Sequence, residues 1–255
     1  MRLLLMAALA VVLLAAAGIA YGYPSLLGPT GQVATPTADT ANLGALQLAG
    51  TFYNTEDDDL VLDNTLIARG TFGLLPILEA GAAFWRADVA GEEIDTISAN
   101  AKFRLPISLI GGTTAVGAIL ARTDVPIGDE LTTTYVYLAN TRGLLGIPGG
   151  STPFKLTLGA NWTQIENGIS VDDIRGFASL QFDLMETISI AAEYQMESED
   201  LGDADPLTSI VGRVGLGENW AIEGGVTNAD PFTAGFTATD EHNLFLSLIF
   251  GWGGV

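Results

Sequence analysis

From residue 44 onward, apolar and polar residues alternate along this chain in repeated stretches. In residues 97–105, Ile, Ala, Ala, Phe and Leu hold every second position, with Ser, Asn, Lys and Arg between them. Residues 154–162 and 187–196 follow the same pattern. Because successive side chains of an extended chain point to opposite faces, a period of two predicts β-strands with one apolar and one polar face.

Twelve such stretches occur, and the fifth is the least regular because Gly111-Gly112-Thr113-Thr114 interrupts it. The predicted strands cover residues 44–53, 64–72, 76–87, 95–105, 107–122, 132–142, 153–163, 174–183, 187–196, 207–216, 219–226 and 242–252. Tight connections at 73–76, 106, 183–186 and 216–219, and a Gly/Pro-rich one at 143–152, alternate with longer polar segments. The longer segments are 54–64, 87–95, 123–131, 164–173, 197–206 and 227–242. An even number of such strands, joined alternately by short turns and long loops, is typical of bacterial outer-membrane barrels.

The charged residues are sorted in the same way, although they were not used to place the strands. The six longer segments contain 23 of the 30 acidic residues and no Lys or Arg. Most basic residues fall on the polar faces of the strands, because a cation that faces lipid costs about 2–4 kcal/mol at the bilayer midplane. The charged residues expected to line the lumen are Arg69, Glu79, Lys102, Arg104, Arg142, Lys155, Arg175, Asp183, Glu193, Arg213 and Glu223.

A soluble β-sandwich is the alternative fold, since it also alternates and buries one face of each strand. Its polar faces would meet water and carry many charges, whereas the polar faces here consist mainly of Ser, Thr, Asn, Gln and Gly. Aromatic residues also gather near the ends of the apolar faces, as in the aromatic girdles of membrane barrels. The sequence therefore predicts an all-β fold, a 12-stranded antiparallel up-and-down transmembrane β-barrel over residues 44–255.

Two segments precede the predicted barrel. Residues 1–22 have a basic start, eighteen uncharged and mostly apolar residues, and a small-residue end, the pattern of a secretory signal peptide. A retained membrane anchor is the alternative, because this apolar length is near the lower limit for a spanning helix. Residues 23–43 contain Gly-Pro turns and few large apolar residues. They form either an irregular periplasmic leader, which we favour, or a strap that enters the lumen.

Two segments resemble parts of known outer-membrane proteins. The last predicted strand, from Asn243 to Trp252, resembles the C-terminal assembly signal of Gram-negative outer-membrane proteins, although three residues follow it. The segment Gly28-Pro29-Thr30-Gly31 with Thr35-Pro36-Thr37-Ala38-Asp39 resembles the start of outer-membrane barrels, some of which are linked to exopolysaccharide export. The first resemblance implies location in a Gram-negative outer membrane and recognition of the C-terminal strand by the barrel-assembly machinery.

Composition argues against several classes of function. The chain has no Cys, so it can have no disulfide, thiol nucleophile or Cys-ligated zinc. A net charge of -20 argues against nucleic acid, whose phosphates require Lys and Arg. The single histidine, His242, follows Asp240 and Glu241, with the nearest serine at Ser247, so no pair of nucleophile and base is evident. We expect neither an enzyme nor a cofactor.

Passage of solutes is the function that the pattern favours. Barrels of 8 strands are filled by side chains, whereas barrels of 16–18 strands leave a water channel, and 12 strands lie between them. Small inward residues such as Gly81, Ala83, Gly159 and Ala191 leave room, and basic lumen residues outnumber acidic ones. We therefore predict a narrow pore for small solutes with a slight anion preference.

The alternative is a non-conducting structural or surface-binding barrel, in which paired lumen charges fill the interior. Its acidic loops would bind divalent cations or lipopolysaccharide, because carboxylate oxygens are the ligands that Ca²⁺ and Mg²⁺ take. The candidate loop residues are Glu56, Asp57, Asp58, Asp59, Glu199, Asp200, Asp203 and Asp205. They lack the spacing of an EF-hand loop, so no defined metal site is predicted. The expected partners are outer-membrane lipid and lipopolysaccharide, and the oligomeric state stays open.

Overall fold

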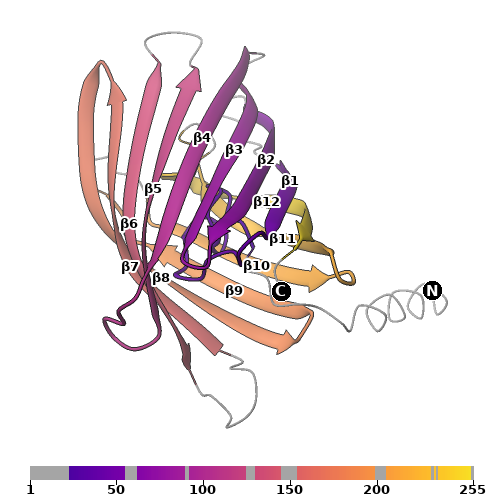
Figure 1. Ribbon diagram of the computed structural model, residues 1–255. Coiled ribbons are helices and arrows are strands. Elements are labelled where there is room, and N and C mark those ends of the chain that lie inside the picture. Colours follow the sequence, from indigo (N-terminus) through magenta and orange to yellow (C-terminus); the bar gives the residue numbers. More distant parts are fainter. Residues whose placement is uncertain are drawn as a thin grey trace, which may run out of the picture.

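The computed structural model is an all-β molecule in which twelve strands close into one barrel (Figure 1). It describes residues 23–54, 62–89, 92–124, 130–144, 154–198, 205–230, 233 and 235–253. Consecutive strands pair antiparallel, and β1 pairs with β12 to complete the ring. The predicted fold class is confirmed. The predicted signal peptide lies outside the described residues.

The strands agree closely with those predicted from the alternation. They are β1 (Leu46–Tyr53), β2 (Leu62–Leu75), β3 (Leu78–Val89), β4 (Glu92–Leu105), β5 (Thr113–Asp124), β6 (Leu131–Leu144), β7 (Phe154–Asn167), β8 (Ile169–Met185), β9 (Ile188–Gln195), β10 (Leu207–Gly215), β11 (Trp220–Ala229) and β12 (Ala238–Trp252). We call the end that carries the β2–β3, β8–β9 and β10–β11 turns the short-turn end, and the opposite end the long-loop end. Among the described residues, no helix is long and apolar enough to cross a membrane.

The two faces of the barrel wall differ in polarity. Outward positions hold exposed apolar side chains, such as Ile97 on β4 and Leu120 on β5. Inward positions on the same strands hold buried polar side chains, such as Thr96 and Thr123, whose hydroxyl groups share a hydrogen bond of 2.7 Å. The closed ring leaves no strand edge unpaired, which is the condition for a β-sheet to lie in hydrocarbon. The wall therefore has the polarity of a membrane barrel.

Strand β5 is shorter than predicted. It begins at Thr113, and residues 106–112 form the connection that follows β4. Gly111 and Gly112 have positive φ values of 82° and 87°, a backbone conformation that glycine adopts readily and that does not continue a strand. The glycine pair that interrupts the alternation is therefore the end of a turn.

The predicted loops 87–95 and 164–173 are mostly paired strand. Strands β7 and β8 are separated by Gly168 alone, which has a φ of 69°. The polar residues that predicted a loop pair across this hairpin, where Gln164 Nε2 donates to Ser170 Oγ at 2.8 Å. Strands that extend past the lipid meet water on both faces, so polarity in these segments does not indicate a loop.

Residues 23–42, which we call the strap, lie inside the barrel (Figure 1). Every residue from Pro24 to Ala38 is buried. Two isolated bridges, Pro24 with Thr30 and Gly31 with Pro36, fold the strap back on itself. The periplasmic leader that we favoured from the sequence is therefore wrong, and the strap is the alternative that describes this segment. Its small residues suit it to a confined space.

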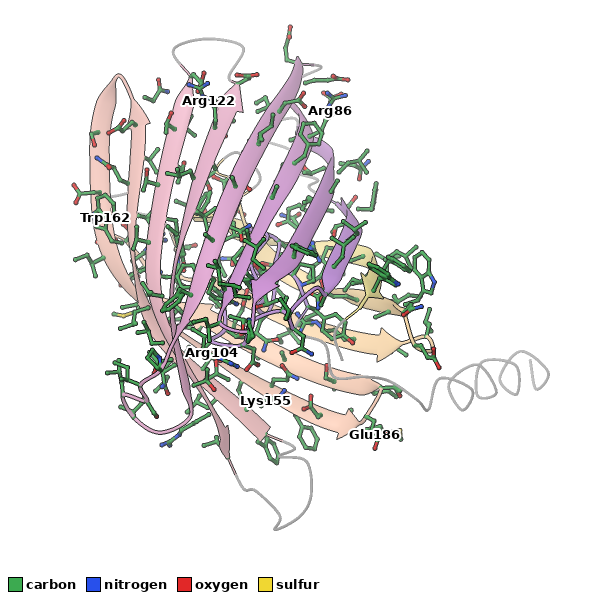
Figure 2. The ribbon with its side chains drawn as sticks, in the orientation of Figure 1. Arg86, Arg104, Arg122, Lys155, Trp162 and Glu186 are labelled. Atoms are coloured by element: carbon green, nitrogen blue, oxygen red, sulfur yellow. The ribbon has the colours of Figure 1, made fainter. Side chains whose placement is uncertain are left out.

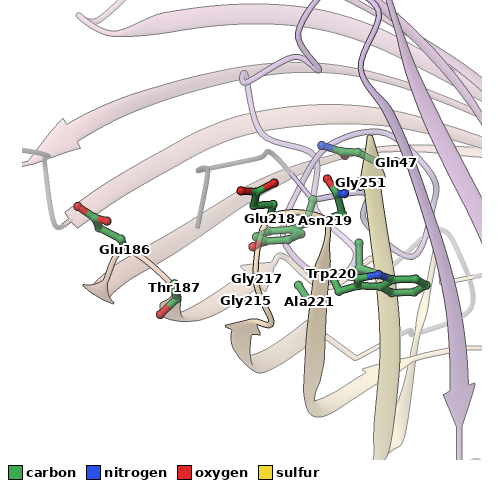
Figure 3. A pocket seen from close by; sticks show the side chains of 12 residues that line it. Gln47, Glu186, Thr187, Gly215, Gly217, Glu218, Asn219, Trp220, Ala221 and Gly251 are labelled. Carbon is green, nitrogen blue, oxygen red and sulfur yellow. The ribbon is translucent and has the colours of Figure 1, made fainter. Parts of the chain in front are cut away.

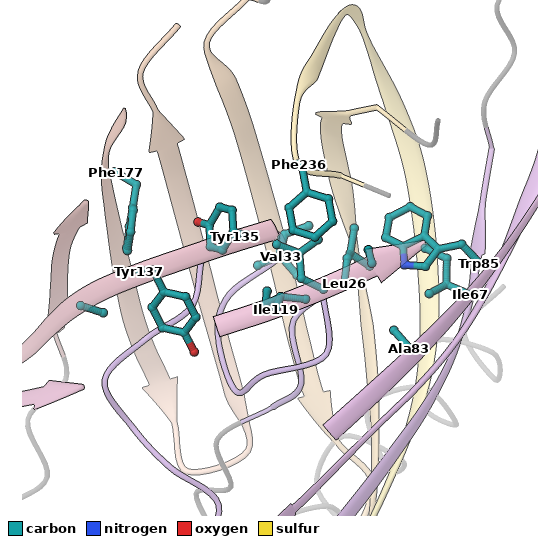
Figure 4. Packing of buried hydrophobic residues seen from close by; sticks show 14 of the residues in the cluster. Leu26, Val33, Ile67, Ala83, Trp85, Ile119, Tyr135, Tyr137, Phe177 and Phe236 are labelled. Atoms are coloured by element: carbon teal, nitrogen blue, oxygen red, sulfur yellow. The ribbon is translucent and has the colours of Figure 1, made fainter. Parts of the chain in front are cut away.

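A hydrophobic core fills the lumen around the strap (Figure 4). Leu26 and Val33 of the strap belong to one cluster with Trp85 of β3, Tyr135 of β6 and Phe236, which precedes β12. None of these side chains is more than 1% exposed. The ring centroids of Tyr135 and Phe236 lie 5.4 Å apart, within the range for favourable aromatic contact. The lumen is closed at this level.

Inward glycines make room for aromatic rings of the adjacent strands. Gly117 on β5 lies against the Tyr137 ring of β6, and Gly159 on β7 lies against the Phe177 ring of β8. A Cβ atom at either glycine would overlap the ring. The prediction that small inward residues leave room for a pore is wrong here, because the neighbouring strand fills the space.

Replacing Gly117 with Ala is expected to lower the free energy of unfolding by about 1–3 kcal/mol, the cost of overpacking a filled site. Urea unfolding of the barrel in detergent, followed by tryptophan fluorescence, measures this change. Gly50→Ala is the matched control, because an added Cβ at this strand glycine meets nothing within 4 Å. Equal destabilisation by the two substitutions would contradict the inference that Gly117 makes room for the Tyr137 ring.

Candidate functional site in the barrel lumen

Seven of the eleven predicted lumen residues are buried inside the barrel, and none of the seven is more than 5% exposed. They are Arg69, Glu79, Lys102, Arg175, Glu193, Arg213 and Glu223. Three others, Arg104, Lys155 and Asp183, are only half-buried. Lys155 Nζ lies 3.9 Å from Asp183 Oδ2, at the limit of an ion pair.

Arg142 does not face the lumen, contrary to the prediction. On β6, Tyr135 and Tyr137 are buried inward, whereas Val136 and Leu138 are exposed outward, and Arg142 shares the parity of the outward pair. Its own side chain is exposed. Because Arg142 lies near the short-turn end of the strand, an outward cation there avoids the middle of the bilayer, where it would cost most.

Glu223 of β11 pairs with two arginines. Its carboxylate oxygens lie 2.9 Å from Arg69 Nη2 and 2.5 Å from Arg213 Nε, and all three side chains are buried. Arg213 also reaches the strap, donating from Nη1 to Gln32 Oε1 and from Nη2 to the Gln32 carbonyl oxygen, both at 2.8 Å. This cluster ties the strap to β10 and β11.

Glu79 of β3 and Lys102 of β4 form a second anchor for the strap. Lys102 Nζ lies 3.0 Å from Glu79 Oε1, and both side chains are completely buried. Glu79 also accepts hydrogen bonds from the backbone N–H groups of Thr30 at 2.9 Å and Ala41 at 2.7 Å. Lys102 donates to the carbonyl oxygens of Thr30 and Thr37. Both charged groups therefore bind the strap backbone as well as each other.

Glu193 of β9 holds the strap without a cation. Its carboxylate accepts hydrogen bonds from three successive backbone N–H groups, those of Val33 at 3.2 Å, Ala34 at 2.8 Å and Thr35 at 3.0 Å. The Thr35 hydroxyl donates a fourth, at 2.7 Å. Successive N–H groups that converge on one anion form a nest that stabilises its charge. The strap backbone thus takes the place of a counter-ion.

The strap residues Thr30 and Thr35 were not predicted to belong to a site. One feature of the sequence indicates that another segment must contact Glu193, and it can be recognised once the strand register is known. Glu193 faces inward, and its cross-strand neighbours on β8 and β10 are Ser179 and Ser209, neither of which carries a positive charge. A buried carboxylate in this position requires hydrogen-bond donors from elsewhere in the chain.

A small hollow lies at the short-turn end, between the start of the strap and the wall (Figure 3). Its lining includes buried Gln47 of β1 and the exposed turn residues Glu186 and Glu218. Tyr23 of the strap forms part of the same lining, and the Arg213 guanidinium lies 5.1 Å from the centre of its ring. A solute that enters from this end would therefore meet the strap.

The basic residues at the two ends of the barrel differ in their partners (Figure 2). Arg86 of β3 pairs with Asp95 at 2.7 Å, and Arg122 of β5 pairs with Glu130, both near the long-loop end. Arg104 lies toward the other end of β4 and forms no ion pair with any described residue. Its charge is available to a solute near the short-turn end.

The acidic loops provide little defined chemistry in the described part of the chain. Seven of the proposed divalent-cation residues lie outside it: Glu56, Asp57, Asp58, Asp59, Glu199, Asp200 and Asp203. The eighth, Asp205, has a raised pKa because its carboxyl group shares a hydrogen bond with the Asp240 carboxyl group and lies in its negative field. No three acidic or histidine side chains of the described residues form a metal site. His242 is exposed, with Nε2 2.6 Å from Thr208 Oγ1.

Solved structures of outer-membrane barrels share this fold. A KdgM porin in complex with disordered oligogalacturonate has a TM-score of 0.55 and 6% sequence identity, covering 82% of this chain and 99% of that chain. The COG4313 outer membrane channel from Pseudomonas putida F1 has a TM-score of 0.56 and 12% identity, covering 87% of this chain and 100% of that chain. No family model and no curated protein sequence matches the chain. The similarity is therefore one of fold.

Replacing Lys102 with Met is expected to lower the free energy of unfolding by about 3–5 kcal/mol, because it leaves the buried Glu79 carboxylate without its cation. The double variant with Glu79→Gln should recover much of this loss, since no buried charge then remains unpaired. Urea titration of the three proteins in detergent measures both effects.

The matched control for this cycle is Lys155→Met, which breaks a half-exposed pair and should cost less than about 1 kcal/mol. A Lys102→Met protein as stable as the Lys155→Met protein would show that the buried pair does not hold the strap and the wall together.

Proposed function

We propose that this protein is an outer-membrane channel for small solutes, closed in the present conformation by its own strap. The observation that carries the proposal is how the strap is held. It is no part of the barrel sheet, and its polar contacts with the wall are hydrogen bonds to side chains such as Glu79, Glu193 and Arg213. Such contacts can be exchanged for water, whereas a strand of the barrel cannot leave without opening the ring.

The wall behind the strap is suited to water. Inward positions carry many hydroxyl and amide side chains, including Thr51, Thr71, Ser98 and Thr157, next to the charged groups. The fold similarity to a porin and to an outer-membrane channel supports both the location and the transport role. Twelve strands enclose more space than the eight-stranded barrels that side chains alone can fill. Withdrawal of the strap would therefore leave a polar passage.

The proposed channel has a slight preference for anions. Of the inward basic residues, Arg104 and Arg175 form no ion pair with any described residue, whereas each inward carboxylate is neutralised or held by N–H groups. The proposal includes no catalytic reaction.

A disulfide that fixes the strap tests the proposal, and the chain has no native Cys to interfere. Ala34 of the strap packs in one cluster with Leu207 and Ala229 of the wall, so the double variant Ala34→Cys/Ala229→Cys places two thiols in this cluster, and loss of free thiol on oxidation shows that they have bonded. In planar bilayers, the oxidised protein should be silent, and reduction should restore discrete conductance steps. The single variant Ala34→Cys controls for the reducing agent.

Conductance that is the same before and after reduction would contradict the role of the strap as the barrier. Silence in both states, and in the wild-type protein, would favour the second candidate function, a non-conducting structural or surface-binding barrel. The hydrophobic core that includes Leu26, Val33 and Trp85 is the observation in favour of this candidate, because such a core resists hydration. Its acidic loops would then bind divalent cations or lipopolysaccharide.

A further inference from the structure

Arg175 differs from the other fully buried charged residues of the lumen. Glu223 has Arg69 and Arg213, Glu79 has Lys102, and Glu193 has the N–H nest of the strap, described above. Arg175 of β8 is 2% exposed and forms no ion pair with any described residue. A buried cation without a counter-ion is unfavourable, so its presence at this position requires an explanation.

The groups that now accept hydrogen bonds from Arg175 are all neutral. Its Nη2 donates to the carbonyl oxygen of Phe236 at 2.7 Å and to Thr163 Oγ1 at 3.1 Å. With the amide oxygen of Gln195 turned toward the guanidinium group, Nη1 donates to it at 2.8 Å. The Nε–H group is buried and has no acceptor. The guanidinium group therefore retains donor capacity as well as its charge.

A second unused donor lies in the same region. The hydroxyl group of Tyr135 on β6 is buried and makes no hydrogen bond of standard geometry, although the Asn161 side chain of β7 lies near it. It also lies within electrostatic range of the Arg175 guanidinium group. The Tyr135 ring packs on Phe236, the residue whose carbonyl oxygen Arg175 holds. Two other titratable groups lie nearby. Asp173 is two residues from Arg175 on the same strand, and Glu193, near Tyr135, is already held by the N–H groups of the strap.

We propose that Arg175 and the Tyr135 hydroxyl group form a binding site for an oxyanion, a carboxylate or phosphate group, of a solute that enters from the long-loop end. An ionised oxygen is a stronger acceptor than the Phe236 carbonyl oxygen, and a planar guanidinium group can bind two of its oxygens at once. The anion replaces that carbonyl oxygen, so Phe236 moves away from Arg175 as the site fills.

This inference deepens the proposed channel function, on which it rests for the route of the solute, and names the class of solute. Arg175 neutralises the charge of the solute at a position where the surrounding core would otherwise exclude it. The slight anion preference is then a property of a particular residue, and Arg104 acts only at the other end. The site would hold one anionic group at a time, because only one guanidinium group is present.

Equilibrium dialysis of the purified barrel in detergent, with radiolabelled citrate and radiolabelled phosphate in separate arms at constant ionic strength, tests the site. Arg175→Gln should weaken binding about ten-fold or more, the factor that one charge-assisted hydrogen bond supplies. Tyr135→Phe keeps the ring and removes only the hydroxyl group, so it should weaken binding less, and Arg175→Lys should retain part of it. The anion that binds more tightly, citrate or phosphate, identifies carboxylate or phosphate as the preferred group.

Arg86→Gln is the matched control, because it removes a cation from the outer face near the same end of the barrel. Heat-modifiable migration on a gel shows that each variant is folded, and Tyr135→Phe still tests the site if Arg175→Gln does not fold. Absence of binding in both arms, or binding that is unchanged in the Arg175 and Tyr135 variants, would overturn the proposal. Because dialysis requires no ion flow, a protein that binds anions through Arg175 and never conducts would refute the channel rather than this site.

Discussion

The interior of this barrel is governed by the requirement that a buried carboxylate must have a partner. Water satisfies a carboxylate at the surface, but Glu79, Glu193 and Glu223 are almost completely removed from it. Each is satisfied by a different solution: a lysine, a nest of N–H groups, and a pair of arginines. Two of the three solutions use the backbone of the strap directly, and Arg213 extends the third to it. The position of the strap follows from these demands.

The fold was largely predictable because each wall residue responds to one of two solvents. Alternation depends only on neighbouring positions, so the twelve strands could be located within a few residues. The errors occurred where that contrast is lost. Near Gly168 the strands extend beyond the lipid, and both faces became polar. Arg142 was assigned to the polar face of its strand, whereas its parity with Val136 shows that it faces outward.

The contents of the lumen could not be predicted in the same way. Thr35 and Glu193 are 158 residues apart, and their contact depends on the closed ring and not on any local pattern. The inward glycines gave a misleading signal, because a missing side chain indicates space without indicating what occupies it. Gly159 is filled by the Phe177 ring of the next strand. The sequence identified most of the charged lumen residues but not the segment that they hold.

The strap connects Glu79 on β3 with Glu193 on β9. In the closed order of strands these two lie six positions apart in either direction, which places them on opposite sides of the ring. The segment between them therefore crosses the lumen and is attached to the wall on both sides. A cylinder that is linked across its width resists flattening. Lateral pressure from the surrounding bilayer would therefore act on the contacts of the strap with Glu79 and Glu193 before it deforms the wall. The same segment that blocks the bore therefore also links opposite sides of the wall.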